Sequence, residues 1–351
     1  MDCATIMFKK IYLRKIIGIK IPMVFLIPLM GISILLIDCF DIFGHKLDPV
    51  PKTIETTDGN SNQQVNRPQH RHSLSDGRLV YPILFNDLAE EATTYSPLKS
   101  SITSVYTDYQ SRGALIDAAV YFFDFSSLEW FGINTEQLFS PGSLMKIGIG
   151  ITVLKRAEQN PNFLNQRITF TEADNEHVAQ TLSDETLQTG KSYGVKELLG
   201  RMLSHSDNHA TSLLCKTCGI DALRKTYNDL GIIPIPQDAN YQITIHQYVR
   251  FFKALFFATY LSQENSEFLM NELAHSGFKN GLEKGNNQQS NLVIAHKFGE
   301  RDYNGIFELH DVGIVYKNGG AYLIGVMTKG KSRVDLEQFI GQISTTLTSA
   351  L

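Results

Sequence analysis

The sequence has few cysteines and no excess of either charge. Four cysteines in 351 residues are too few for a disulfide scaffold. We expect Cys215 and Cys218 to be core thiols on one helix, with a local disulfide as the alternative. The 32 Lys and Arg against 36 Asp and Glu give a formal net charge of −4. Because such a chain has no basic field to hold a polyanion, we exclude nucleic acid as a partner.

The composition also excludes two kinds of architecture. Collagen-like chains and wholly disordered chains need a far more biased composition than 43% hydrophobic residues, 26 Gly and 11 Pro. A chain of this length forms one large domain or two ordinary ones, with an ample core.

The N-terminal forty residues differ from the rest. Residues 21–36 contain no ionisable side chain, and the apolar run continues to Ile37. Seventeen helical residues span roughly 25 Å, near the lower limit for crossing a bilayer. Five basic residues precede this run (Lys9, Lys10, Arg14, Lys15 and Lys20), whereas Asp38 and Asp41 follow it. We therefore expect residues 1–15 to be cytoplasmic, residues 16–38 to be a transmembrane signal-anchor, and the remainder to be extracytoplasmic, periplasmic or at the cell surface.

Cleavage or lipidation of this end is the alternative. No small-x-small cleavage site follows the apolar run, and Asp38 precedes Cys39 where a lipoprotein acceptor needs a small residue. Residues 39–77 are polar and read as a linker without a core of its own. The linker histidines have no acidic or thiolate partner, so we expect no metal site there.

Regular structure is expected from residue 78 to residue 351. Strands are predicted over 116–123, 128–133, 292–298, 313–317 and 321–328, and helices over 86–112 and 334–349. Residues 145–285 show no clear strand alternation and predict an all-helical lobe. If the strands share one sheet, the fold class is α/β of the α+β type. It has a sheet flanked by helices, a helical lobe, and a site between them.

The first candidate for chemistry is the S-x-x-K element Ser143-Leu-Met-Lys146. Two other serines, Ser96 and Ser276, begin the same pattern, so context must decide. Ser140-Pro-Gly precedes Ser143 and predicts a helix with a capping Ser and Pro at the first position. Ser143 then lies in the first turn, and Lys146 shares its face. A serine hydroxyl needs a base, and lysine can be that base when burial lowers its pKa.

Two further polar elements lie far along the chain. Ser206-Asp207-Asn208 occurs once, and its hydroxyl could relay a proton while its amide binds a substrate carbonyl. An ordinary helix N-cap is the alternative for this element. Residues 296–299, His-Lys-Phe-Gly, end a predicted strand, where Lys297 could hold a substrate carboxylate and Gly299 could let a ligand lie along the edge. An ordinary strand terminus is the alternative there.

In this order, S-x-x-K, S-D-N and K-x-G resemble the motifs of class A β-lactamases and penicillin-binding proteins. Four segments carry the resemblance, which covers about residues 80–351: residues 139–146 (FSPGSLMK), 198–208 (LLGRMLSHSDN), 295–300 (AHKFGE) and 310–316 (HDVGIVY). The resemblance implies a serine hydrolase acting on small-molecule or peptide acyl donors, either β-lactams or peptidoglycan-like peptides. It implies no cofactor and no metal.

The resemblance also implies a role for each site residue. Ser143 would be the acylated nucleophile and Lys146 its base or proton relay. Ser206 would shuttle the proton, Asn208 would contact the substrate amide, and Lys297 would supply positive potential. The backbone N–H groups of Ser143 and Glu300 would form the oxyanion hole, with Phe298 and Gly299 beside it.

Two departures from the family pattern bear on turnover. Phe298 replaces the Thr or Ser whose hydroxyl helps to bind a substrate carboxylate. Residues 232–241 contain no Glu to activate the deacylating water, and Asp238 is the only carboxylate there. An acyl-enzyme on Ser143 should therefore persist. The alternative is a catalytically silent, membrane-tethered binding or scaffold domain of the same fold.

Overall fold

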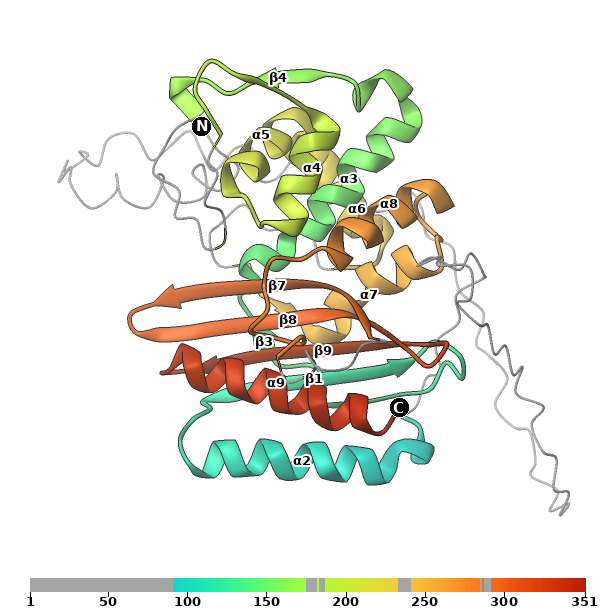
Figure 1. Cartoon of the computed structure of the whole chain (residues 1–351), viewed down its shortest axis with the longest axis vertical. Coiled ribbons are helices and arrows are strands. Elements are labelled where there is room, and N and C mark those ends of the chain that lie inside the picture. The colour runs from blue at the N-terminus through green and yellow to red at the C-terminus, as the bar shows by residue number, and fades with distance from the viewer. Residues whose placement is uncertain (1–90, 175–181, 183–186, 233–240, 285, 287–291) are drawn as a thin grey trace, which may run out of the picture. The chain divides into compact units, whose positions relative to one another are not determined.

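A five-stranded antiparallel sheet forms the centre of the molecule (Figure 1). The computed structural model describes residues 91–174, 182, 187–232, 241–284, 286 and 292–351. The strand order is β2-β1-β9-β8-β7, and every neighbouring pair is antiparallel. The strands are β1 (Asp117–Asp124), β2 (Trp130–Ile133), β7 (Val293–Tyr303), β8 (Ile306–Lys317) and β9 (Gly320–Gly330).

Helices α2 (Ser96–Ser111) and α9 (Arg333–Ser349) cover one face of the sheet. An apolar cluster fills this layer, with Ile102 of α2, Val120 of β1 and Ile340 of α9 fully buried. Tyr109 packs edge-on against Phe339 of α9, with ring centroids 5.2 Å apart. Because the sheet is covered on both faces, β1 reads as a continuous apolar run and shows no alternation.

The helical lobe covers the opposite face (Figure 1). Its central helix, α3, presents buried side chains almost all round, as expected of a helix that is surrounded by others. The lobe helices are α3 (Met145–Gln159), α4 (Val195–Ser204), α5 (Asn208–Cys218), α6 (Ile220–Asp229), α7 (Ile245–Phe256) and α8 (Gln263–Ala274). The α+β class, with a sheet flanked by helices and a lobe, is therefore confirmed.

Two details of the expected architecture are wrong. The middle of the chain is not all-helical, because short strands lie within residues 145–285 and take part in two antiparallel strand pairs. They are β3 (Leu138–Phe139) with β6 (Ile243–Thr244), and β4 (Arg167–Thr169) with β5 (Ser192–Gly194). Strand β8 also begins seven residues earlier than predicted. Asn304 and Gly305, with φ of 56° and 75°, form a tight hairpin turn that the sequence analysis overlooked.

The N-terminal predictions lie outside the described residues. This applies to the expected cytoplasmic segment 1–15, the signal-anchor 16–38 and the linker 39–77. Among the residues that are described, no helix is both long enough and apolar enough to cross a membrane.

Candidate active site

Ser143 lies in a short 3-10 turn, η2 (Gly142–Leu144), and not in the α-helix itself. Helix α3 begins two residues later, at Met145, so Lys146 stands in its first turn. The predicted cap is wrong, because the Ser140 side chain caps no helix here. Ser143 is half-buried and Lys146 is buried. The turn thus presents the hydroxyl near the surface and the amine inside.

Ser140 instead anchors the η2 turn, which carries Ser143, to the sheet. Its backbone N–H donates to Glu308 Oε2 (3.0 Å), and its hydroxyl accepts from Arg301 Nη1 (2.9 Å). Its carbonyl accepts from His310 Nε2 (2.9 Å), while His310 Nδ1 accepts from the Thr328 N–H (3.1 Å). This arrangement fixes one neutral tautomer, and burial lowers the pKa of His310 to about 4. The sequence signal for this anchor is the alternation of Glu308 and His310 with apolar residues along the same strand.

Two glycines let the η2 turn lie directly against β7. A Cβ on Gly142, whose φ is +52°, would lie 2.4 Å from the Glu300 carbonyl oxygen. A Cβ on Gly299 would lie 2.4 Å from the Pro141 carbonyl oxygen. Only glycine allows this approach. It brings the backbones of Ser143 and Glu300 onto adjoining segments, where the sequence analysis expects an oxyanion hole.

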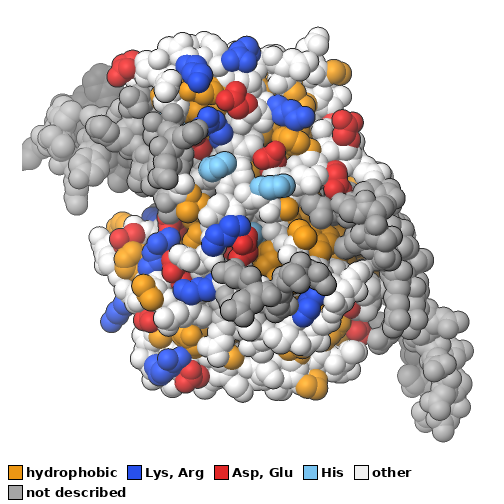
Figure 2. All heavy atoms as spheres, viewed as in Figure 1, with side chains coloured by type: hydrophobic (Ala, Val, Ile, Leu, Met, Phe, Trp, Pro, Cys, Tyr) orange, Lys and Arg blue, Asp and Glu red, His pale blue; other side chains and the backbone are white. Residues whose placement is uncertain are grey.

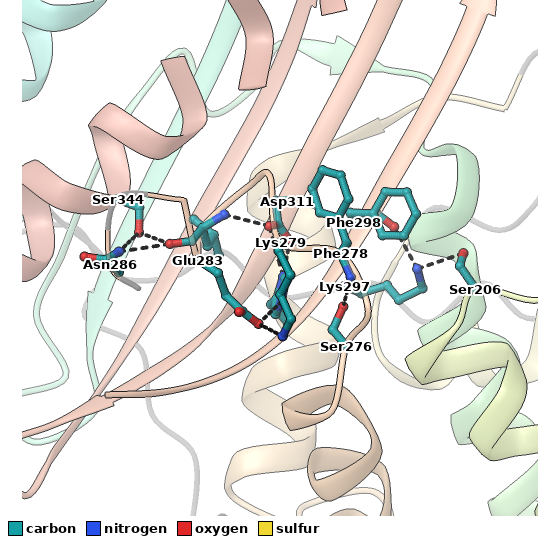
Figure 3. Close-up of polar contacts among 12 residues, drawn as sticks. Ser206, Ser276, Phe278, Lys279, Glu283, Asn286, Lys297, Phe298, Asp311 and Ser344 are labelled. Carbon is teal, nitrogen blue, oxygen red and sulfur yellow. Dashed lines mark hydrogen bonds and ion pairs between the residues drawn. The ribbon is translucent and has the colours of Figure 1, made fainter. Parts of the chain in front are cut away.

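Four of the predicted site residues meet in one hydrogen-bonded cluster. Lys146 Nζ donates to the Ser206 carbonyl (2.5 Å), to Ser206 Oγ (2.9 Å) and to Asn208 Oδ1 (2.6 Å). Lys297 Nζ donates to Ser206 Oγ (3.0 Å) and to the Phe298 carbonyl (3.0 Å), as Figure 3 shows. We call Lys146, Ser206, Asn208 and Lys297 the lysine cluster. It joins α3, the α4–α5 turn and β7.

The α4–α5 turn holds Ser206 in an unusual backbone conformation. Its φ is 56°, in the left-handed region that non-glycine residues rarely adopt. Asp207 follows as the N-cap of α5 and accepts from the N–H groups of His209 (2.8 Å) and Ala210 (3.0 Å). The element does contain a helix N-cap, but the cap is Asp207, one residue later than the alternative interpretation expected, and Ser206 and Asn208 contribute to the cluster. The tight turn is what directs Ser206 and Asn208 to the same amine.

Burial dominates the electrostatics of the cluster. It lowers the pKa of Lys146 to about 7, although Asp207 works against this shift. Burial, and then the charge of Lys146, lower the pKa of Lys297 well below its usual range. Both amines contact one hydroxyl, and like charges this close disfavour each other. A neutral amine near pH 7 is therefore accessible in this cluster.

Two observations concern the remaining site residues, Ser143 and Phe298. Among the hydrogen bonds of the described residues, none joins Ser143 Oγ to Lys146 Nζ, although the two residues are only three positions apart in the chain. Phe298, expected beside a substrate, has a ring that is only 1% exposed. That ring stacks on Phe278 with centroids 4.3 Å apart, and Lys297 Nζ lies 4.2 Å from its centre. Phe298 therefore covers the lysine and offers no exposed surface to a ligand.

A buried charged network behind Lys297 escaped the sequence analysis. The fully buried His296 contacts both Asp311 oxygens (2.8 and 2.9 Å) and Glu283 Oε1 (3.2 Å). The Leu282 N–H also donates to Asp311 (2.8 Å), and Figure 3 shows Glu283 reaching Lys279. Burial lowers the pKa of His296, but the two carboxylates outweigh it and raise that pKa to about 9. The network fastens the segment that carries Phe278 to the sheet.

Two smaller predictions concern cysteine and metal. Cys215 and Cys218 are buried thiols on α5, which confirms them as core residues. Within the part of the chain that the structure describes, no group of three or more His, Cys, Asp or Glu side chains could hold a metal ion.

The antiparallel sheet, its helical lobe and the lysine cluster between them define a protein of the serine β-lactamase type. The chain belongs to the β-lactamase enzyme family, whose family model matches residues 97–351. No curated protein matches the sequence.

Solved structures of this type share the fold. A β-lactamase from Chitinophaga pinensis is 19% identical, with a TM-score of 0.63, over 73% of this chain and 99% of its own. The TLA-3 extended-spectrum β-lactamase is 20% identical, with a TM-score of 0.64, over 72% and 98%. A penicillin-G acyl-enzyme of a PBP-A mutant is 21% identical, with a TM-score of 0.61, over 72% and 96%. At these identities the likeness concerns the fold.

The His296 network predicts a stability that depends on pH. The pKa of His296 lies above the ordinary 6.5, so its imidazolium contributes stability fully below pH 6.5, and this contribution is lost as the pH rises through about 9. Replacing His296→Gln should remove this dependence. The difference in unfolding free energy between wild type and variant should shrink between pH 6 and 10, by roughly 3 kcal/mol at most. Denaturant unfolding across this range measures it.

The wild type must be compared with the variant because the titration of Lys146 changes the unfolding free energy with pH in the opposite direction. Its lowered pKa makes the folded state more stable as the pH rises above 7. The exposed His205→Gln is the control and should leave the profile unchanged. A constant difference between wild type and His296→Gln would contradict the assignment. If that variant does not fold, NMR titration of the wild-type His296 ring should show its transition near pH 9.

Proposed function

We propose that this protein is a serine hydrolase that forms an acyl-enzyme on Ser143. Its substrates are amide or β-lactam compounds or cell-wall peptides. One observation carries the proposal: a buried lysine with a pKa of about 7, hydrogen-bonded to Ser206 and Asn208, stands one turn after Ser143. A lysine with this pKa is available as a neutral base at physiological pH. Membership of the β-lactamase enzyme family supports the same chemistry.

In the proposed reaction, Ser143 Oγ attacks the substrate carbonyl carbon and its proton passes to the neutral amine of Lys146. The carbonyl becomes an oxyanion, which the N–H groups of Ser143 and Glu300 hold. The bond to the leaving group then breaks, and the leaving atom takes a proton from Ser206 Oγ. Lys146 or Lys297 returns a proton to Ser206. The acyl group stays on Ser143 as an ester.

The hydrogen bonds of the lysine cluster are compatible with a neutral Lys146. Two N–H groups of the amine can donate to the Ser206 carbonyl and to Asn208 Oδ1. Its lone pair can then accept from the Ser206 hydroxyl, whose oxygen accepts from Lys297. For acylation, the amine must exchange one of these contacts for Ser143 Oγ. Such contacts commonly tighten only when substrate binds.

Deacylation is proposed to be slow. Release of the acyl group needs a base that activates water, and residues 232–241 contain no Glu. Asp238, the only carboxylate in that stretch, lies outside the described residues. A long-lived ester on Ser143 is therefore expected.

A catalytically silent, membrane-tethered binding or scaffold domain is the second candidate. It is favoured by the missing hydrogen bond between Ser143 and Lys146 and by the aromatic cover over Lys297. Acyl transfer separates the two candidates, because only the hydrolase takes up an acyl group covalently.

Labelling tests the nucleophile. Incubation of the full-length chain in detergent with labelled penicillin or a fluorophosphonate should add one acyl or phosphonyl group to Ser143, observed by mass spectrometry. The Ser143→Ala variant should lose the label because the attacking hydroxyl is gone. Ser96→Ala is the matched control, since Ser96 begins another S-x-x-K element but lies exposed at the start of α2. Absence of label with every donor would leave only the silent domain.

The rate of labelling should depend on pH through Lys146. As the pH rises through about 7, the amine loses its proton and becomes a base, so the rate should rise and then level off. Lys146→Arg keeps the charge but cannot lose a proton, and it should slow labelling by about 100-fold or more. Initial rates between pH 5 and 9 measure this effect. A rate that is flat across pH 7 would exclude Lys146 as the base.

The proposed location is outside the cytoplasmic membrane, with residues 16–38 as the anchor. The apolar run and its basic flank support this proposal. In cells, the full-length chain should resist alkaline extraction from membranes, and removal of residues 1–38 should release it. Cys39→Ala is the control, because its release would indicate a lipid anchor in place of a membrane-spanning one. Extraction of the unmodified chain by alkali would contradict the anchor.

A further inference from the structure

The lysine on β7 is enclosed by the protein itself. Lys297 is fully buried, and its ammonium donates to Ser206 Oγ and to the Phe298 carbonyl. The Phe298 ring lies 4.2 Å from the same nitrogen, a cation–π distance. Substrate anions bind such a cation through a short charge-assisted hydrogen bond, which needs an open donor direction. A carboxylate therefore cannot reach Lys297 without displacing the ring.

The Phe298 ring, which covers Lys297, is held in place by its stacking on Phe278. Phe298 stacks on Phe278, with an interplanar angle of 18°, and Figure 3 shows the two rings beside the Lys297 side chain. Phe278 belongs to the segment that follows α8, and its N–H donates to Ser276 Oγ (3.3 Å). The same segment is fastened to the sheet by Asp311, which accepts from the Leu282 N–H. The rings are thus part of the packed core, so moving them aside costs packing.

The other basic side chains of β7 and α9 near the η2 turn are held by the protein. Arg301 donates to Ser140 Oγ, and Arg333 pairs with Glu300 (3.1 Å) and with Glu337 (3.5 Å). Glu300 adds a carboxylate at the residue whose N–H is assigned to the oxyanion hole. Among the described residues visible in Figure 2, basic and acidic side chains are intermingled on the face over β7 and β8. Arg301 and Arg333 thus already have protein partners, and the Phe298 ring lies over Lys297.

We infer that this site takes acyl donors without a carboxylate next to the scissile bond, that is, neutral esters, amides or lactams. The inference rests on the proposed acylation of Ser143 and narrows its substrate class. A carboxylate that is desolvated in the site without a charged donor costs free energy, whereas a neutral group in the same place does not carry that cost. Phe298 is the residue that determines this specificity.

A matched pair of acyl donors tests the inference. Penicillin G and its methyl ester differ only in the carboxylate. The rate at which each compound labels Ser143 is divided by the rate at which the same compound hydrolyses in hydroxide, which corrects for its intrinsic reactivity. On the full-length wild type, the methyl ester should react about ten- to hundredfold faster. The carboxylate of penicillin G loses its water in the site and gains no charge-assisted hydrogen bond in exchange. An equal rate, or a faster acid, would overturn the inference.

Two variants locate the preference at Phe298. Phe298→Thr should uncover Lys297 and lower the preference for the ester at least several-fold, whereas the apolar Phe298→Leu should retain it. If the Thr variant retains the full preference, Phe298 is not the determinant. If Phe298→Thr does not fold, the wild-type pair alone still decides the substrate class. Lack of labelling by both donors and by a neutral fluorophosphonate overturns the proposed function itself, which is a different outcome from labelling with the wrong preference.

Discussion

The site depends on one hydroxyl placed between two buried amines. Ser206 Oγ lies 2.9 Å from Lys146 Nζ and 3.0 Å from Lys297 Nζ, and both lysines are buried. Burying two ammonium groups side by side is costly, so the cluster favours losing a proton. The same contacts connect the helical lobe to the edge of the sheet. A single polar cluster thus couples the chemistry of the site to the relative placement of its two layers.

Backbone conformation and hydrogen bonds in the surrounding structure hold this cluster in place. Ser140 is anchored to the sheet through its N–H, carbonyl and hydroxyl, and Gly142 and Gly299 allow two backbones to touch. Ser206 is kept in a left-handed conformation by the turn between two helices. The left-handed conformation of Ser206 costs stability locally and is maintained because the lobe and sheet are packed around it. Such pre-organisation is expected where geometry, more than stability, is needed.

Several features that depend on local sequence pattern were predicted correctly from the sequence. The strand pair across residues 124–127 and the final helix were found because apolar runs and turn residues are local signals. Asn304-Gly305 carried an equally good hairpin signal that was overlooked. The function of Ser140 was misjudged for another reason. A Ser before Pro is typical of a helix start, and its actual partners, Glu308 and His310, lie about 170 residues away, so that only tertiary packing could reveal them.

The sequence by itself determined the residue types and their order: a hydroxyl three residues before an amine, a Ser-Asp-Asn turn and a lysine near the end of a strand. Those identities specify which chemistry the chain can perform, because side-chain reactivity is set by covalent structure. Tertiary structure alone decided how far each group is from water and from its neighbours. Burial lowered the pKa of Lys146 to about 7, and packing placed the Phe298 ring over Lys297. Solvation and proximity arise only when distant segments meet, and no local pattern contains them.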